Sequence, residues 1–236
     1  MQKKENSEQI FKETFSQRVN LAISTNDPIT WDFDLTLPIL SQTQTQTQTQ
    51  TQTQTQTQTQ TQKEIKVFTA DESRFGLMTV LRRRITLKGV KPVVKFQQSF
   101  ENTYLYGAVE PKTGDSFFFE LPRLNTTCFQ IFLDELSLAF PHSLNILVLD
   151  NGSFHKADKL KLPSNIRLLF TPPYTPEVNP IERVWLSFKS ILADYIFSSI
   201  DQLSERLSSI ISSCSSSEFS SLTFFPFFKP VINALS

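Results

Sequence analysis

The sequence predicts an α/β fold in which a mixed sheet is flanked by helices. Strand-like segments follow one another at the start of the ordered part, and helix-like segments then separate two later apolar strands. Strands joined by short turns pair antiparallel, whereas strands separated by crossovers pair parallel. The 236 residues suffice for one domain with appendages, and a composition with 39% hydrophobic residues and 22 Phe supplies a substantial core.

The first 62 residues are expected to lie outside this domain. Residues 1–40 are a short mixed segment in which Ile10, Phe11 and Phe15 indicate one amphipathic helix. Residues 41–62 consist mainly of ten Thr-Gln dipeptides, which offer no apolar face and predict a disordered linker. An expanded repeat tolerated at a boundary explains this linker without a function.

The first half of the domain reads as strands. A strand is expected over 65–70, ending at Asp71, and another over 76–81. The segments 103–109 and 116–121 are expected to form a hairpin across a turn that contains Gly114.

Helices and buried strands alternate in the second half. Residues 126–140 predict a helix that is stopped by Pro141, and the continuous apolar run 145–149 predicts a central buried strand. A further strand is expected over 166–170. Apolar residues at helical spacing predict a long helix over 180–197. The Ser-rich and Phe-rich residues 201–236 are expected to form a tail, with a weak helix within 203–221.

Composition excludes several classes of protein. With only 5 Gly, the chain has no glycine-rich phosphate-binding loop. The distant Cys128 and Cys214 form neither a metal-binding nor a disulfide pattern, which indicates a reducing compartment. The polar N-terminus does not resemble a signal peptide, and no apolar run is long enough to span a membrane.

A local basic stretch stands out in a chain whose net charge is zero. Between Glu72 and Glu101 there are seven basic residues and no acidic one: Arg74, Arg82, Arg83, Arg84, Lys88, Lys91 and Lys95. Clustered Lys and Arg side chains are typical of surfaces that contact nucleic-acid phosphates. Arg82, Arg83, Arg84 and Lys88 are therefore candidate DNA-binding residues, although a solvated basic pair of strands would look the same.

Three acidic residues stand at the ends of predicted elements. Asp71 and Asp150 each follow a strand, and Glu182 lies in the first turn of the helix entered through Asn179-Pro180. Carboxylate oxygens are the ligands that Mg²⁺ prefers, so three of them within about 4–8 Å would suit a two-metal phosphoryl-transfer site. Each also has a structural alternative: a turn at Asp150, a capping box between Asn179 and Glu182, and plain surface charge at Asp71-Glu72.

His155 and Lys156 follow Asp150 closely. His155 is one of two histidines and could contact a phosphate, position a water molecule or hydrogen-bond the site carboxylate. An ordinary surface histidine is the alternative. Both residues are retained as DNA-binding candidates.

Two segments resemble a known family. Asp150-Asn-Gly-Ser-Phe-His-Lys156 and Pro172-Pro-Tyr-Thr-Pro-Glu-Val-Asn-Pro-Ile-Glu-Arg-Val-Trp185 resemble the catalytic motifs of mariner-superfamily DDE transposases, in their bacterial insertion-sequence branch. The segment Asp71-Glu-Ser-Arg-Phe-Gly76 is also similar. The resemblance covers residues from about 63 to 230. Relatives tend to have Trp before the Lys-Gly pair, whereas this chain has Ile85. We therefore expect a packing difference at that position.

The resemblance implies a ribonuclease H-like catalytic domain over 63–200. It implies a metal-binding catalytic triad of Asp71, Asp150 and Glu182, two Mg²⁺ ions with Mn²⁺ as a substitute, and cleavage and strand transfer at insertion-sequence ends. The implied partners are terminal-repeat and target DNA, with a homodimer assembled on DNA and no membrane. The implied location is the bacterial cytoplasm, at the nucleoid.

Relatives carry helix-turn-helix modules ahead of the catalytic domain, and residues 1–40 show no such pair. A recognition part encoded separately would explain this. A truncated, inactive remnant that regulates transposition by binding DNA or transposase is the alternative function, and a nuclease acting on RNA–DNA hybrids is a third.

Overall fold

The computed structural model describes residues 63–79, 85, 87–91, 93, 95–157, 159–171 and 179–225. The segment 1–40, the Thr-Gln linker and the end of the Phe-rich tail lie outside these residues. In chain order the elements are β1 (Glu64–Gly76), β2 (Asn102–Val109), β3 (Ser116–Leu121), α2 (Thr126–Ala139), β4 (Ser143–Leu149), η1 (Ser153–Lys156), β5 (Ile166–Phe170), α3 (Glu182–Leu192), α4 (Ile200–Ser213) and α5 (Ser216–Thr223).

The strands form one mixed sheet in the order β3-β2-β1-β4-β5. β1, β2 and β3 pair antiparallel, whereas β4 pairs parallel with both β1 and β5. The β3–β4 connection contains α2, and the β4–β5 connection contains η1. The predicted α/β class with a mixed, helix-flanked sheet is confirmed.

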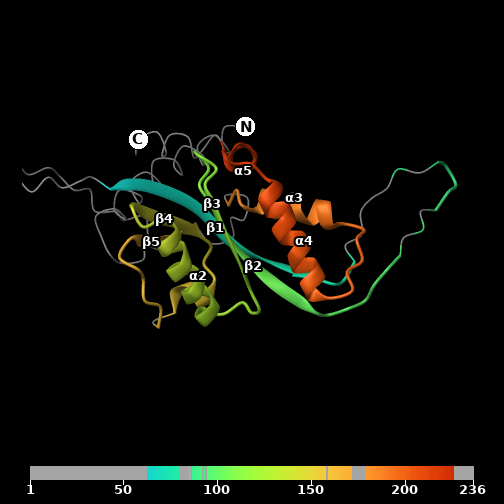
Figure 1. The fold of residues 1–236 in the computed structure, drawn as a ribbon, viewed down its shortest axis with the longest axis horizontal. Coiled ribbons are helices and arrows are strands. Elements are labelled where there is room, and N and C mark those ends of the chain that lie inside the picture. Colours follow the sequence, from blue (N-terminus) through green and yellow to red (C-terminus); the bar gives the residue numbers. More distant parts are fainter. Residues whose placement is uncertain are drawn as a thin grey trace, which may run out of the picture.

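Two apolar clusters cover the two faces of this sheet. Phe68 and Ala70 of β1 face α2, together with apolar residues of β4 and β5. Phe75 faces α3, α4 and α5 on the other side. Because side chains alternate along a strand, β1 contributes to both clusters. Figure 1 shows α2 apart from the group formed by α3, α4 and α5.

β1 is longer than its sequence pattern predicted. The expected end at Asp71 is wrong, since the strand continues to Gly76 and pairs with β2 from Thr69↔Val109 to Gly76↔Asn102. The second strand expected over 76–81 is absent at residues 77–79, and the rest of it lies outside the described residues. β2, which is distant in the sequence, supplies the hydrogen-bond partners for the part of β1 that extends beyond its pairing with β4.

The helical regions also differ in their bounds. α3 ends at Leu192, five residues before the predicted end, and Asp194 then adopts a positive φ of 69°. Residues 201–236 were expected to form a tail with one weak helix within 203–221, and the structure has two helices there, α4 and α5. Leu203, Leu207 and Phe219 of these helices are buried in the cluster on the α3 side. Serine caps at Ser199 and Ser215 begin the two helices.

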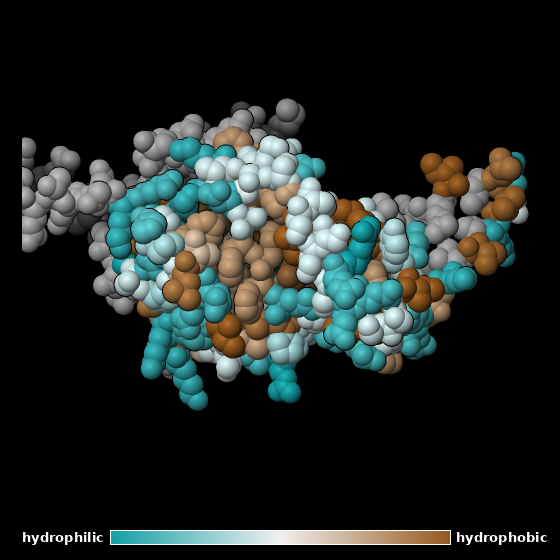
Figure 2. Space-filling model, viewed as in Figure 1, coloured by the Kyte–Doolittle hydropathy of each residue, from teal (hydrophilic) through white to brown (hydrophobic). Residues whose placement is uncertain are grey.

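The connection between β1 and β2 carries exposed apolar side chains. Ile85, Leu87, Val90 and Val93 are all exposed. Figure 2 shows hydrophobic side chains on the part of this connection that projects from the sheet. Within the described part of the chain, no helix is both long and apolar enough to cross a membrane.

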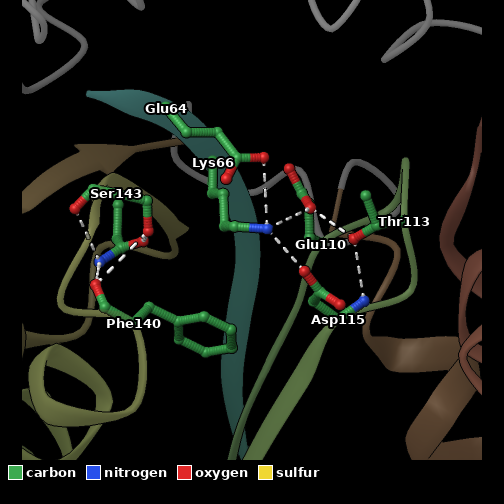
Figure 3. Close-up of polar contacts among 8 residues, drawn as sticks. Glu64, Lys66, Glu110, Thr113, Asp115, Phe140 and Ser143 are labelled. Atoms are coloured by element: carbon green, nitrogen blue, oxygen red, sulfur yellow. Dashed lines mark hydrogen bonds and ion pairs between the residues drawn. The ribbon is translucent and has the colours of Figure 1, made fainter. Parts of the chain in front are cut away.

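A partly buried lysine joins β1 to the β2–β3 turn (Figure 3). The Nζ of Lys66 lies 2.6 Å from Asp115 and 3.7 Å from Glu110, whose side chains are 37% and 7% exposed. Burial lowers the pKa of Lys66, but the hydrogen bond to Asp115 and the charges of Glu110, Asp115 and Glu64 outweigh it, so its pKa is raised. Burial also raises the pKa of Glu110.

Replacing Lys66 with Met should lower the free energy of unfolding by about 2 kcal/mol at pH 8, because it leaves the Glu110 carboxylate buried without its cation. The deficit should shrink toward pH 4. Burial raises the folded-state pKa of Glu110, so the carboxyl is protonated there and needs no cation. Chemical denaturation at both pH values measures the difference. Adding Glu110→Gln should recover part of the loss at pH 8, and an equal deficit at both pH values would contradict this account.

Candidate active site

The pairing of β1 with β4 brings two of the predicted carboxylates to the same level of the sheet. The parallel register runs to Thr69↔Val148. Asp71 lies two residues after Thr69 and is still within β1. Asp150 lies two residues after Val148 and directly follows β4. Neighbouring parallel strands therefore deliver Asp71 and Asp150 to one region, at the C-terminal end of β4 where side chains converge in open α/β sheets.

α3 is attached to β1 on both sides of Glu182. Before it, the Asn179 amide donates a hydrogen bond of 3.0 Å to the carbonyl of Ala70. After it, the indole N–H of Trp185 donates to Oδ2 of Asp71 at 3.0 Å. These two contacts position the start of α3, and with it Glu182, against the strand that carries Asp71.

Gly107 makes room for this attachment. It lies opposite Asp71 in the β1–β2 register. A Cβ atom at this position would lie 2.5 Å from Cη2 of Trp185 and 2.9 Å from the ring of Phe118. A larger residue would displace the indole that donates to Asp71, so the absence of a side chain here serves the site.

Glu182 is not part of a helix cap. α3 begins at Glu182 with Ile181 in the N-cap position, and no side chain makes a capping hydrogen bond. The Asn179 side chain, which the capping-box alternative required, instead contacts Ala70. Glu182 is exposed, so its carboxylate is available for another partner.

His155 lies between two carboxylates and is itself buried. Its Nδ1 is 3.1 Å from Oδ1 of Asp150, and its Nε2 is 3.1 Å from Oε1 of Glu72. Burial lowers the pKa of His155, but the contacts with Asp150 and Glu72 outweigh it and raise the pKa to about 9. The contact with His155 lowers the pKa of Asp150. Of the three roles considered for His155, the structure shows the contact with the site carboxylate.

The surroundings of Asp71 disfavour its ionised form. Burial and the nearby charges of Glu72 and Glu182 raise its pKa to about 7, despite hydrogen bonds from the Glu72 backbone and the Trp185 indole. Among the described residues, no Lys or Arg forms an ion pair with Asp71 or Glu182. A buried carboxylate beside two others is an environment that a cation would stabilise.

The expected convergence of three carboxylates is not met in this arrangement. Within the described ranges, no group of three His, Cys, Asp or Glu side chains is arranged to hold a metal ion. Oδ1 of Asp150 is engaged by His155 and by the backbone N–H of Gly152 at 2.9 Å. The oxygen donor set of Asp71, Asp150 and Glu182 nevertheless fits a hard divalent cation.

The predicted DNA-binding residues are distributed as follows. Lys88 and Lys156 are exposed, whereas His155 is 2% exposed and presents no surface to a DNA backbone. The Nζ of Lys156 contacts Oδ1 of Asn151 at 2.5 Å and lies over the ring of Phe170. Arg82, Arg83 and Arg84 lie outside the described residues.

Two residues of the site were not recognised in the sequence. Glu72 was interpreted only as surface charge, yet its side chain is 5% exposed and contacts His155. Trp185 was assigned to the apolar stripe of its helix, which it does join, but its indole N–H also binds Asp71. The alternation of a β1 that runs through Asp71 would have placed Glu72 on the opposite, buried face.

Comparison with known proteins identifies the family of this chain and solved structures that share its fold. The DDE superfamily endonuclease family matches residues 66–204, which include Asp71, Asp150 and Glu182. A relative from Sinorhizobium fredii, the uncharacterized protein y4pE/y4sA, is 36% identical over 102 residues, covering 42% of this chain and 76% of the relative.

Solved structures of the Mos1 transposase share the fold. The paired-end complex with the left transposon end has a TM-score of 0.56 and 15% identity, over 72% of this chain and 55% of that one. The mariner paired-end complex with Mn has the same TM-score and 18% identity, over 72% of this chain and 56% of that one. The likeness confirms the predicted ribonuclease H-like arrangement. The chain spans about half the length of these solved proteins.

Asp71→Asn should stabilise the metal-free protein. Because burial and like charges raise the folded-state pKa of Asp71 from 3.8 to about 7, its stabilising contribution is complete below pH 3.8 and is lost as the pH rises through 7. Asn carries no charge, so at pH 8 the variant should be more stable by on the order of 1–3 kcal/mol, and by less at pH 5. Thermal denaturation at the two pH values measures this. A variant less stable than wild type at pH 8 would contradict it.

Proposed function

The chain belongs to the DDE superfamily endonuclease family, and we propose that it is the catalytic part of a mariner-like transposase of the bacterial insertion-sequence type. It would cut DNA at the ends of the element and join those ends to target DNA, at the nucleoid. The observation that carries this proposal is the family match over residues 66–204. Within this range Asp71 lies in β1, Asp150 directly follows the neighbouring parallel strand β4, and Glu182 begins a helix attached to β1.

The proposed chemistry depends on Asp71, Asp150 and Glu182 as oxygen ligands for Mg²⁺ or Mn²⁺. Two divalent ions would activate the attacking oxygen and stabilise the leaving oxygen of a phosphodiester. Within the chain, Trp185 and His155 each engage one oxygen of Asp71 and Asp150, respectively. The repulsion from Glu72 and Glu182 that raises the pKa of Asp71 would be relieved on cation binding.

DNA contacts in this proposal come from basic side chains of two segments, the β1–β2 connection and the residues after Asp150. Lys88 and Lys156 are exposed, and Arg82, Arg83 and Arg84 belong to the same basic stretch as Lys88. Such contacts bind phosphates and do not specify sequence. We propose that a separately encoded helix-turn-helix part supplies recognition of the terminal repeats, and that two copies assemble on DNA.

The test is metal-dependent cleavage by the full chain. With DNA carrying the terminal repeats that flank its coding sequence, wild type should nick in Mg²⁺ or Mn²⁺ and not in chelator. Asp150→Asn and Glu182→Gln should each lower the rate by at least about 100-fold, because each removes charge that holds the metal ions. Asp134→Asn, which changes an exposed carboxyl on α2, is the matched control and should retain the wild-type rate. Wild type and Asp150→Asn behaving alike would contradict catalysis by this site.

A second function is a catalytically silent regulator that binds DNA or transposase. It predicts binding to terminal-repeat DNA without metal-dependent nicking. Comparing duplex DNA with RNA–DNA hybrids in the same assay also tests a general hybrid nuclease, which would prefer the hybrid.

A further inference from the structure

Glu72 is a buried carboxylate that the proposed chemistry does not use. It follows Asp71 in β1 and, by strand alternation, lies on the α2 side of the sheet with Phe68 and Ala70. Its side chain is 5% exposed, and Oε1 lies 3.1 Å from Nε2 of His155. Burying a charged group is costly unless a specific partner compensates it, and His155 is that partner for Glu72.

The His155 ring is held in one place. It packs against Phe129 with a centroid distance of 4.5 Å and against Phe154 at 4.1 Å, and its side chain is 1% exposed. With the ring held by these neighbours, one nitrogen faces Glu72 and the other faces Asp150. His155 therefore links the strand that carries Asp71 to the segment that carries Asp150.

The link determines which oxygen of Asp150 is engaged. Oδ1 lies 3.1 Å from Nδ1 of His155 and accepts a hydrogen bond of 2.9 Å from the backbone N–H of Gly152. Oδ2 has no hydrogen-bond or ion-pair partner among the described residues. The Asp150 side chain is 62% exposed and follows the end of a strand, so without these contacts it would be free to change rotamer.

We propose that Glu72 and His155 are positioning residues for the metal site. Glu72 anchors His155, and His155 holds Oδ1 of Asp150, so that Oδ2 would be the oxygen open to a divalent cation. This inference rests on the proposed function. Partners that orient a ligating group typically change metal affinity by about 10–100-fold when removed.

Two substitutions of His155 separate positioning from packing. In His155→Asn, the side-chain amide nitrogen occupies roughly the place of Nδ1, so it keeps a donor to Asp150 and loses the contact with Glu72. In His155→Gln, the amide nitrogen reaches roughly the place of Nε2, so it keeps the contact with Glu72 and loses Asp150. Both remove the ring from its contacts with Phe129 and Phe154, so their effects on stability should be similar.

The readout is Mn²⁺ binding to the full chain by calorimetry without DNA, together with the melting temperature in chelator. His155→Gln should weaken Mn²⁺ binding about 10-fold, and His155→Asn by about 3-fold or less. Leu136→Ala, which opens a cavity in the same apolar cluster but leaves the His155 ring and both of its nitrogens in place, is the stability control. It should lower the melting temperature and leave Mn²⁺ affinity unchanged.

Glu72→Gln tests the other end of the link with a nearly isosteric change, and should weaken Mn²⁺ binding by about 3-fold. Equal Mn²⁺ affinities for the two His155 variants, or a loss of Mn²⁺ affinity in Leu136→Ala as large as in His155→Gln, would overturn the inference. Asp150→Asn distinguishes a failure of the positioning role from a failure of the proposed function. If it abolishes Mn²⁺ binding while the His155 variants bind normally, only the positioning role fails. If it leaves Mn²⁺ binding unchanged, the metal site and the proposed function fail with it.

Discussion

The attachment of α3 to β1 is the constraint on which the candidate site depends. The sheet pairing alone places Asp71 and Asp150 on neighbouring strands, but the third carboxylate belongs to a helix that begins more than a hundred residues after β1. The Asn179 and Trp185 contacts lie three residues before and three residues after Glu182. Together they convert a distant helix into a fixed neighbour of Asp71, and the apolar packing of α3 on the sheet supports them.

The alternation of β1 divides the acidic pair Asp71-Glu72 between two tasks. Asp71 faces α3 and has little compensation for its charge, whereas Glu72 faces α2 and has His155. The uncompensated charge of Asp71 lowers the stability of the protein. The contact of Glu72 with His155 offsets the cost of burying the Glu72 carboxylate. Strained or uncompensated groups of this kind are retained where function requires them. Two neighbouring carboxylates thus differ in role because a strand points them in opposite directions.

The sequence predicted much of this architecture from local patterns, and it failed where distant partners decide the outcome. The apolar runs at β4 and β5, the β2–β3 hairpin and the start of α3 follow from composition and turn residues. The length of β1 does not, because Gly76 remains in the strand only through its pairing with Asn102. Glu72 was misinterpreted for the same reason, since a strand ending at Asp71 leaves no face on which to place it. The indole of Trp185 fits a helical apolar stripe, and its polar role appears only once Asp71 lies beside it.

The candidate site therefore consists of a rigid part and an adjustable part. Asp71 lies inside a strand paired on β2 and is held by Trp185, whereas Asp150 follows a strand end and Glu182 is exposed at a helix start. In the free protein, the charges of Glu72 and Glu182 disfavour the ionised form of Asp71, and a divalent cation would reverse that effect. Binding a cation would also fix the exposed Asp150 side chain in one rotamer. Contacts that already restrict Asp150, such as those from His155 and Gly152, reduce the conformational entropy lost at that step. On the proposed function, metal affinity is set as much by these supporting contacts as by the three ligands themselves.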